Sequence, residues 1–395
     1  MKVLAINAGS SSLKFMLLAM PSEEVLTSGI VERIGSSVGI FTIKVKGVKL
    51  TKEAAIATHK EAVEMLLVSL IENKIIAKVE EIEGVGHRVV QGGEAFKTSV
   101  VIDDQVVKVI EDLSDLAPLH NPANLIGINT FRNLLKNVIN VAVFDNAFHS
   151  TMQPETYLYG TPYQWYRQYK VRKYGFHGTS HQYVSQRASQ LLNKKNSKII
   201  VCHLGNGASI AAIKNGQSID TSMGLTPLEG IPMGTRSGSI DAGIIEYIAN
   251  KENLSIKAVT DILNKKSGYL GISEYSNDAR DIEAKIKQGD PLAKLAFDIQ
   301  TKRIADYIGA YYLQLGGLDA LCFTAGIGEN SALIRKGVLN RLKVLKVKWD
   351  EDLNSQTRGQ ETLISTPDSK VKVWVIPTNE EVMIARDVYS LAQKS

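Results

Sequence analysis

The sequence predicts an α/β fold built from two similar halves. Two segments carry this prediction, residues 3–18 and 199–213: each is an apolar strand that breaks into a turn of glycine and hydroxyl residues and returns as a second strand. Glycine lets backbone amides approach an anion closely, and successive amides in such a turn form a concave anion site. The turns begin at Asn7 and His203, which can each offer a ligand. Two such turns predict two halves that hold one polyphosphate without a Walker-type loop, whose motif this sequence lacks.

The composition is that of an ordinary globular protein, with 44% apolar and 22% charged residues among 395. The length predicts two or three domains and a large core. The net charge of +5 is spread along the chain; it fits small anionic ligands and is weak support for a nucleic-acid partner, so none is expected. The two cysteines, Cys202 and Cys322, lie in apolar runs and are expected to be buried free thiols.

The start of the chain resembles a signal peptide only superficially. Asn7, three serines and Lys14 interrupt its apolar run, so no signal peptide is expected. No uninterrupted apolar run is long enough to span a bilayer. These observations predict a cytoplasmic protein with no membrane partner.

In the first half, a β-rich segment precedes a helix and two buried strands. Strands are expected at residues 13–18, 29–31 and 39–45 after the opening strand. Thr58 and Glu61 have the spacing of a capping box, and the apolar residues that follow fall on one helical face. Residues 84–90 and 138–144 predict buried strands that end in polar residues, where α/β sheets place ligand groups.

The second half repeats this order of elements after the strand pair at 199–213. Asp290 and Pro291 begin a long helix that is expected to reach about Leu315 and to stop at Gly316. A strand at 319–324, a glycine-containing turn at 325–330, another helix, a strand at 371–376 and a final helix should follow. The expected domains are residues 1–149 with 381–395, and residues 150–380.

Eight segments in this order together resemble the acetate kinase family. They are residues 7–14, 86–90, 144–145, 174–180, 203–207, 234–238, 326–330 and 378–381. The resemblance implies duplicated ribonuclease-H-like domains of the actin/Hsp70/sugar-kinase superfamily, with an ATP cleft between them. It also implies a homodimer that uses Mg²⁺, or alternatively Mn²⁺, and ATP to phosphorylate acetate reversibly, giving acetyl phosphate and ADP by in-line transfer.

The chemistry of this reaction brings two anions together. The acceptor carboxylate is ionised at neutral pH and needs no general base, so the demand is for cations, and the arginine fork matches both carboxylate and phosphate. Arg88 and Arg236 lie on glycine-flanked segments, as this role requires; an isolated arginine is otherwise most often a surface ion-pair former. The resemblance makes Arg88 substrate-binding and Arg236 catalytic.

Two further residues complete the implied catalytic set. Asp145 ends an apolar strand. Because the acceptor needs no general base, the chemistry favours a positioning role for Asp145, either holding Mg²⁺ through water or orienting Arg236, and disfavours proton transfer. The structural alternative is that Asp145 caps the next segment. The resemblance implies that His177 stabilises the transferring phosphoryl group, although a lone histidine is more often an ordinary core or loop residue.

The remaining site residues follow from the resemblance. The metal would be held by Asn7 and Glu380, because Mg²⁺ needs only one or two protein oxygens. The acceptor's methyl group would meet an apolar pocket formed by Val90, Leu119, Phe176 and Pro227. ATP would be contacted by Lys14, His203, Leu204, Gly205, Asn206, Gly207, Asp278, Ala279, Arg280, Gly326, Ile327, Gly328, Glu329 and Asn330.

The chain departs from the family pattern at a few positions. Gln91 stands where the family usually has histidine and Asn146 where threonine is usual, while changes flank the Arg236 loop at Pro232, Ser239 and Ala242. None removes a residue assigned to chemistry. A kinase for propionate or another short-chain carboxylate remains an alternative, since an apolar pocket discriminates a methylene by only about 1–3 kcal/mol. A non-catalytic ATP switch of the actin or chaperone type is the alternative from another class.

Overall fold

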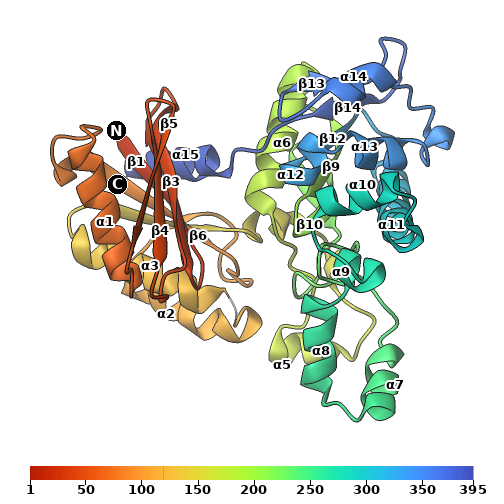
Figure 1. Cartoon of the computed structure of the whole chain (residues 1–395), viewed down its shortest axis with the longest axis horizontal. Helices are drawn as coiled ribbons and strands as arrows, with labels where there is room; N and C mark the ends of the chain where they lie inside the picture. Colours follow the sequence, from red (N-terminus) through yellow and green to blue (C-terminus); the bar gives the residue numbers. More distant parts are fainter. Residues whose placement is uncertain (119, 395) are drawn as a thin grey trace. The chain divides into compact units, whose positions relative to one another are not determined.

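The computed structural model describes residues 1–118 and 120–394, so the expected pocket residue Leu119 lies outside the described residues. The chain forms two compact units, each with its own sheet and helices (Figure 1). The first unit is Met1–Phe148 with Asn379–Ser395, and the second is His149–Thr378. A short 3-10 helix, η3 (Ala147–Thr151), contains the point where the chain passes from one unit to the other.

The first unit contains an eight-stranded sheet in the order β5-β4-β3-β2-β1-β6-β8-β7. Strands β1 to β5 form an antiparallel meander, and β6 and β8 continue the sheet in parallel from β1. The strands are β1 (Lys2–Ala8), β2 (Ser12–Ala19), β3 (Glu24–Glu32), β4 (Gly39–Val45), β5 (Val48–Ala54), β6 (Ile82–Val89), β7 (Val100–Val101) and β8 (Ile139–Phe144).

Helices cover both faces of this sheet. They are α1 (His59–Glu72), α2 (Asp104–Asp112), α3 (Asn121–Leu134) and α15 (Glu380–Ala392), with the 3-10 turns η1 (Val79–Glu81) and η2 (Leu113–Leu116). Along β1, Leu4 and Ile6 join a core that includes residues of α1 and α3, whereas Val3 and Ala5 join a core that includes residues of α15. Because β1 is buried on both faces, it reads as an almost continuous apolar run.

Helix α15 approaches β6 closely because two glycines lie beneath it. A Cβ atom at Gly84 would come within 2.5 Å of Val388 Cγ1, and one at Gly86 within 2.3 Å of Ile384 Cγ2. This contact anchors α15 along β6, the strand that carries Arg88 two residues after Gly86. The helix therefore begins at Glu380 against the sheet edge where functional residues are expected.

The second unit contains a six-stranded sheet in the order β11-β10-β9-β12-β14-β13. Its strands are β9 (Lys198–Leu204), β10 (Ala208–Lys214), β11 (Gln217–Thr221), β12 (Ala320–Thr324), β13 (Thr362–Leu363) and β14 (Lys372–Val375). As in the first unit, antiparallel strands come first, here β9, β10 and β11. Strands β12 and β14 then continue the sheet in parallel from β9. The strand order β3-β2-β1-β6-β8 thus recurs as β11-β10-β9-β12-β14, which confirms the predicted structural repeat.

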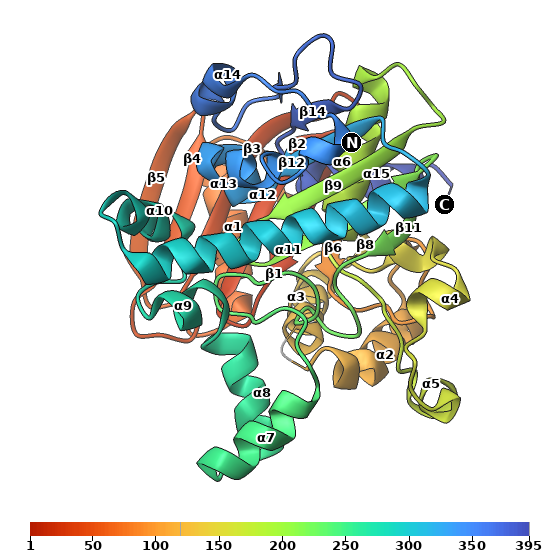
Figure 2. The same ribbon diagram turned by 90° about the vertical axis from the view of Figure 1, so that its right-hand side faces the viewer.

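Helix α11 (Pro291–Leu315) packs against β9 and β10. Figure 2 shows this long helix in front of β9. Asp290 caps its start by accepting a hydrogen bond from the Ala293 N–H, and Gly316 ends it at φ +65°, as the sequence predicts. The other helices of this unit are α4 (Pro154–Tyr157), α5 (Tyr163–Tyr169), α6 (Gly178–Leu191), α7 (Gly243–Glu252), α8 (Ile256–Lys265), α9 (Gly268–Ser273), α10 (Ala279–Lys287), α12 (Ala325–Asn330), α13 (Ala332–Leu339), η4 (Lys343–Leu345) and α14 (Glu351–Gln356).

Two local expectations are corrected by the structure. The strand expected over 84–90 ends at Val89, because the Val90 N–H donates to the Asn124 side chain instead of a neighbouring strand. The turn expected at 325–330 is the short helix α12. Its first residue, Ala325, has a positive φ of +63°, whereas Gly326 and Gly328 do not have a positive φ.

The described residues also bear on the expectations about thiols and membranes. Cys202 and Cys322 are buried and free, as predicted, and burial raises the pKa of both thiols. Across residues 1–118 and 120–394, no helix combines the length and the apolar character needed to cross a bilayer.

Gly86→Ala should weaken the contact between α15 and β6. The added methyl group has no room beside Ile384, so we expect the free energy of unfolding to fall by about 1–3 kcal/mol. Urea unfolding measures this loss, with Gly160→Ala as the matched control because a Cβ there meets nothing within 4 Å. Equal unfolding midpoints for the two variants would contradict the close approach.

Candidate active site

In the first unit, Arg88 and Asp145 form a two-pronged ion pair at the ends of adjacent parallel strands. Arg88 Nε lies 2.9 Å from Asp145 Oδ1, and Nη2 lies 2.6 Å from Oδ2. Asp145 directly follows β8, and its backbone N–H donates to the Val89 carbonyl at 2.9 Å. The carboxylate is buried, whereas the Arg88 side chain is 23% exposed, so part of the guanidinium remains accessible to a ligand.

Further carboxylates stand at the start of α15, close to this pair. Burial lowers the pKa of Arg88, but its pairing with Asp145 and the charges of Glu380 and Glu381 outweigh that effect and raise it overall. The pKa of Glu380 is raised, chiefly by burial and further by Asp145 and Glu381, against the opposing effect of Arg88 and Lys14. Lys14 is itself ion-paired to Glu381. Three carboxylates thus face two cations, an excess that an additional cation would balance.

The expected metal residues Asn7 and Glu380 fit such a cation by their chemistry. Asn7 lies opposite Lys14 in the β1–β2 ladder, and both Asn7 and Glu380 are partly exposed. In the described part of the chain no three His, Cys, Asp or Glu side chains are grouped to hold a metal. A complete protein cage is not required, because Mg²⁺ keeps several waters and binds substrate phosphates.

The loop at residues 90–93, which follows β6, is held by three asparagine side chains. Its first three backbone N–H groups donate in turn to the Oδ1 atoms of Asn124, Asn121 and Asn146, at 3.1, 3.1 and 2.8 Å. Asn124 also donates to the Ala8 carbonyl at 2.8 Å, which ties this loop to the end of β1. The loop is therefore preorganised, and it places Val90 in a buried position.

The two departures from the family pattern at Gln91 and Asn146 meet in this same loop. Asn146 donates to the Gly93 carbonyl at 3.0 Å, and Gln91 Oε1 accepts from the Gly93 N–H at 2.9 Å. The side chains at these two positions therefore shape one hydrogen-bonded segment. The sequence did not predict that Asn121 and Asn124 hold this loop. They lie at the start of α3, about 30 residues further along the chain, and nothing in the sequence links them to the loop.

In the second unit, His177 stands at a strained position beside a second imidazole. It precedes α6 with φ +57°, a conformation that residues other than glycine seldom adopt. Its ring stacks on that of His203, with centroids 4.1 Å apart and planes 19° from parallel. Its Nδ1 lies 2.8 Å from Ser209 Oγ. The neighbouring Phe176 is buried, and its carbonyl lies 3.0 Å from His149 Nε2.

His203 is fixed by a chain of hydroxyl groups. Its Nδ1 lies 2.7 Å from Ser180 Oγ, which lies 2.8 Å from Thr378 Oγ1. The Thr378 N–H in turn donates to Glu329 Oε1 at 3.1 Å. Glu329, expected at the nucleotide, thus has partners within the protein and holds α12 to the strand end that precedes Thr378.

Arg236 lies at the glycine turn between β9 and β10. Its Nη1 donates to the Pro227 carbonyl at 3.2 Å, and no carboxylate forms an ion pair with it among the described residues. Burial lowers the pKa of its guanidinium. A Cβ atom at Gly207 would lie 3.3 Å from Arg236 Nη1 and 3.5 Å from His177 Nε2. The open side of Gly207 therefore faces both a cationic group and an imidazole, and a side chain there would take up space beside them.

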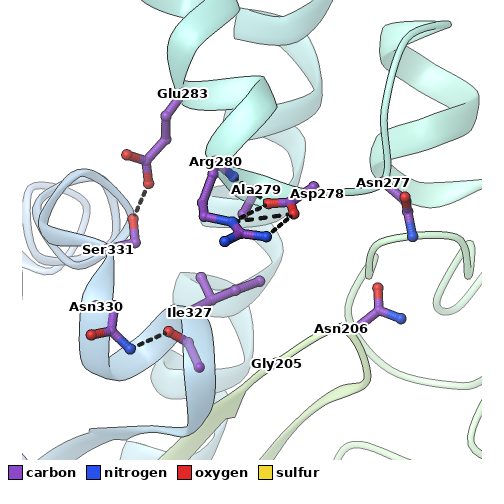
Figure 3. A pocket seen from close by; sticks show the side chains of 11 residues that line it. Gly205, Asn206, Asn277, Asp278, Ala279, Arg280, Glu283, Ile327, Asn330 and Ser331 are labelled. Atoms are coloured by element: carbon purple, nitrogen blue, oxygen red, sulfur yellow. Dashed lines mark hydrogen bonds and ion pairs between the residues drawn. The ribbon is translucent and has the colours of Figure 1, made fainter. Parts of the chain in front are cut away.

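A cavity of about 540 Å³ lies beside this turn in the second unit (Figure 3). Its volume suits a small-molecule ligand. Eight residues expected at the nucleotide line it: Gly205, Asn206, Asp278, Ala279, Arg280, Gly326, Ile327 and Asn330. Asp278 caps α10 and forms an ion pair with Arg280, whose side chain reaches over the cavity in Figure 3.

The other expected nucleotide residues of this unit lie outside the cavity lining: His203, Leu204, Gly207, Gly328 and Glu329. Three lining residues were not expected from the sequence, Asn277, Glu283 and Ser331. Asn277 and Ser331 adjoin expected segments. Glu283 lies one helical turn after Arg280, so helical spacing alone places it on the same face. Its hydrogen bond from Ser331 Oγ joins segments that are distant in sequence, and the sequence did not predict it.

Comparison with known sequences gives a match over nearly the whole chain. A profile of the Acetokinase family matches residues 2–386. The chain is 59% identical over 395 residues to the acetate kinase of Acholeplasma laidlawii (strain PG-8A), with 100% of each protein covered. It is 56% identical over 394 residues to the acetate kinase of Phytoplasma australiense, covering 100% of this chain and 99% of that relative.

Solved structures give a corresponding likeness. The acetate kinase of Porphyromonas gingivalis matches with a TM-score of 0.95 and 45% identity, covering 99% of each chain. A propionate kinase from Francisella tularensis matches with a TM-score of 0.93 and 43% identity, covering 98% of this chain and 99% of that one.

Proposed function

The chain belongs to the acetokinase family, and on that premise we propose that it phosphorylates acetate with ATP, reversibly, to give acetyl phosphate and ADP. Acetate kinases have the actin/Hsp70/sugar-kinase type of fold, and the likeness to their solved structures confirms the fold class expected from the sequence. The observation that carries the proposal for the site is the Arg236 guanidinium, which has no carboxylate partner in the described chain and lies with His177 at the Gly207 turn.

The acceptor is assigned to the first unit. Acetate is ionised at neutral pH, so the reaction needs no proton removed from it. Asp145 is already engaged by two hydrogen bonds to Arg88, which supports a positioning role for this carboxylate and not proton transfer. The exposed part of Arg88 would hold the acetate carboxylate, and Val90 and Leu119 would contact its methyl group. Phe176 and Pro227, the other residues that the resemblance implies for this pocket, belong to the second unit.

The nucleotide is assigned to the second unit. The 540 Å³ cavity would take the adenosine end of ATP, and the turn from His203 to Gly207 would approach its phosphates with backbone amides. Arg236 and His177 would face the negative charge that spreads over the equatorial oxygens during transfer. Phosphoryl transfer requires the acceptor residues of the first unit and the nucleotide residues of the second unit to act on the same reactants. The proposal includes this requirement.

Mg²⁺, or Mn²⁺ in its place, is the implied metal, and it would neutralise phosphate charge when bound. Asn7 and Glu380 are the proposed protein ligands, and Lys14 would contact the phosphates. The excess of carboxylates beside Arg88 supports a cation at this place.

We also propose a homodimer, which the family resemblance implies. The composition and the apolar pattern of the sequence further support a cytoplasmic location with no nucleic-acid or membrane partner. The order of elements supports domains at residues 1–149 with 381–395 and 150–380.

The leading alternative is a propionate or other short-chain carboxylate kinase, which the likeness to a propionate kinase favours. A non-catalytic ATP switch is the alternative from another class. Incubation with Mg-ATP and a series of acids, followed by trapping with hydroxylamine, separates the three. We expect acyl phosphate with acetate as the best substrate. A higher efficiency with propionate would favour the first alternative, and no trapped product with any acid would favour the switch.

Arg236→Ala should lower kcat by about 100-fold or more, because it removes a preorganised cation from the site of charge development. Steady-state kinetics and circular dichroism test this, with Arg303→Ala on the exposed face of α11 as the matched control. A folded Arg236→Ala protein with near-normal kcat would remove Arg236 from the catalytic set.

Val90→Ala should raise the efficiency for propionate relative to acetate. Removing two methyl groups makes room for one more carbon, and the change should lie within the roughly 1–3 kcal/mol that a methylene is worth. The gain should appear mainly in KM, since Val90 is not assigned to the phosphoryl group. If Val90 is only a core residue, the variant will lose thermal stability and treat both acids alike, which would exclude it from the pocket.

Gly326→Leu should weaken nucleotide binding. Gly326 lines the cavity, and a Cβ atom there meets nothing within 4 Å, so a larger side chain can occupy space that the nucleotide needs. We expect the Kd for ATP, measured by calorimetry, to rise at least about tenfold, equivalent to 1.4 kcal/mol. Gly326→Ala is the graded control and should change it little. Unchanged affinity in Gly326→Leu would place the nucleotide elsewhere.

A further inference from the structure

Ser209 Oγ lies between two imidazole rings in the second unit. It is 2.8 Å from His177 Nδ1 and 2.7 Å from His181 Nε2. Ser209 on β10 and His181 on α6 are both fully buried, and His181 stands one helical turn after His177. A hydroxyl group has one proton and two lone pairs, so it could in principle accept from both rings. In the described chain Ser209 Oγ has no other hydrogen-bond partner, so accepting from both would leave its buried proton without an acceptor. Ser209 therefore donates to one ring and accepts from the other.

The direction of this relay follows from the other nitrogen of His181. His181 Nδ1 is buried and has no hydrogen-bond partner in the described chain. Burial holds the pKa of His181 well below its usual value, and His149 and His203 lower it further, so the ring is neutral and carries one proton. A proton on Nδ1 would be a buried donor without an acceptor, which folded proteins seldom contain. The proton therefore belongs on Nε2, which donates to Ser209 Oγ.

The orientation of Ser209 then determines the state of His177. Because Ser209 accepts from His181 Nε2 and must place its own proton on an acceptor, it donates that proton to His177 Nδ1. A neutral His177 ring must accordingly carry its proton on Nε2. This nitrogen is the one that lies 3.5 Å from the Cβ position at Gly207, on the side where Arg236 Nη1 also stands.

We propose that Ser209 and His181 are positioning residues that lock His177 in the Nε2–H tautomer, so that this imidazole donates a hydrogen bond to the transferring phosphoryl group. The inference rests on the proposed function for its purpose, but the tautomer itself is a property of the protein without ligands. The opposite tautomer would present a lone pair to an anion and would repel it. The strained backbone at His177 and the stacked His203 ring restrict the ring to this orientation.

Long-range ¹H–¹⁵N spectra of protein labelled at the histidine nitrogens test the tautomer directly. The His177 signals are assigned by their loss in His177→Gln. We expect the wild-type ring to be neutral with Nε2 protonated, and Ser209→Ala to give a mixture of tautomers. The matched control is Ser197→Ala, which removes an equally buried hydroxyl contact, 2.7 Å from Ser189 Oγ, and should leave the His177 signals unchanged.

Kinetics of the same variants test the consequence. Ser209→Ala should lower kcat by about 10- to 100-fold with little change in KM for ATP or acetate, because it weakens a donor that acts in the transition state. His181→Gln keeps an N–H near the place of Nε2 and should retain more of kcat and of the tautomer than His181→Phe. If kcat falls equally in His181→Gln and His181→Phe, His181 has only a structural role, and its part in the relay is overturned.

The outcomes separate the inference from the proposed function. A wild-type His177 that is protonated on Nδ1, or on both nitrogens, would overturn the inference even if no variant folds. An unchanged tautomer in folded Ser209→Ala would do the same. Wild-type protein that shows the expected tautomer but yields no hydroxylamine-trappable acyl phosphate would overturn the proposed function and leave the tautomer assignment in place.

Discussion

Burying a positive charge is costly unless it is compensated, and two arginines of this chain meet that constraint in different ways. Arg88 is compensated by the Asp145 carboxylate through two short hydrogen bonds. Arg335 on α13 is fully buried, and its partners among the described residues are neutral oxygens: the side chain and carbonyl of Asn354 and the carbonyls of Gly328, Glu329 and Thr357. Burial lowers the pKa of Arg335 to about 10.

Arg236 has neither kind of full compensation. Its described oxygen partner is a single carbonyl, and burial lowers the pKa of its guanidinium. An anion that reaches Arg236 therefore gains more than one that reaches an arginine already paired, because no existing ion pair must be broken. This difference, and not only the presence of an arginine, is what supports the proposed role of Arg236 toward a negatively charged ligand.

Hydrogen bonds also join the parts of the second unit that are assigned to different ends of the nucleotide. Glu329 on α12 binds the Thr378 N–H, and the hydroxyl groups of Thr378 and Ser180 continue the chain to His203. Arg335 fixes the carbonyl side of the same short helix. The cavity wall and the stacked imidazoles are therefore parts of one connected structure, which favours a preorganised site.

Much of the fold was predictable because its signals are local. The apolar strands around two glycine turns, the Asp290 cap and the Gly316 stop each act within a few residues, and the structure contains all of them. The residue types at the site, arginines and histidines on glycine-flanked segments, were also visible, as was the family resemblance that assigned their roles. The end of β6 was misplaced by one residue, because the competing partner of Val90 is the side chain of Asn124, 34 positions away.

The sequence by itself determined the α/β class, the repeated order of elements and the family, and it supplied the residues that are proposed for the chemistry. Only the tertiary structure decided how those residues are used: that Asp145 engages Arg88, that Glu329 faces Thr378 and not the cavity, and that Ser209 lies between His177 and His181. The physical reason is range. Strand and helix preferences depend on near neighbours in the chain, whereas ion pairing, burial and the direction of a hydrogen bond depend on groups that folding alone brings together.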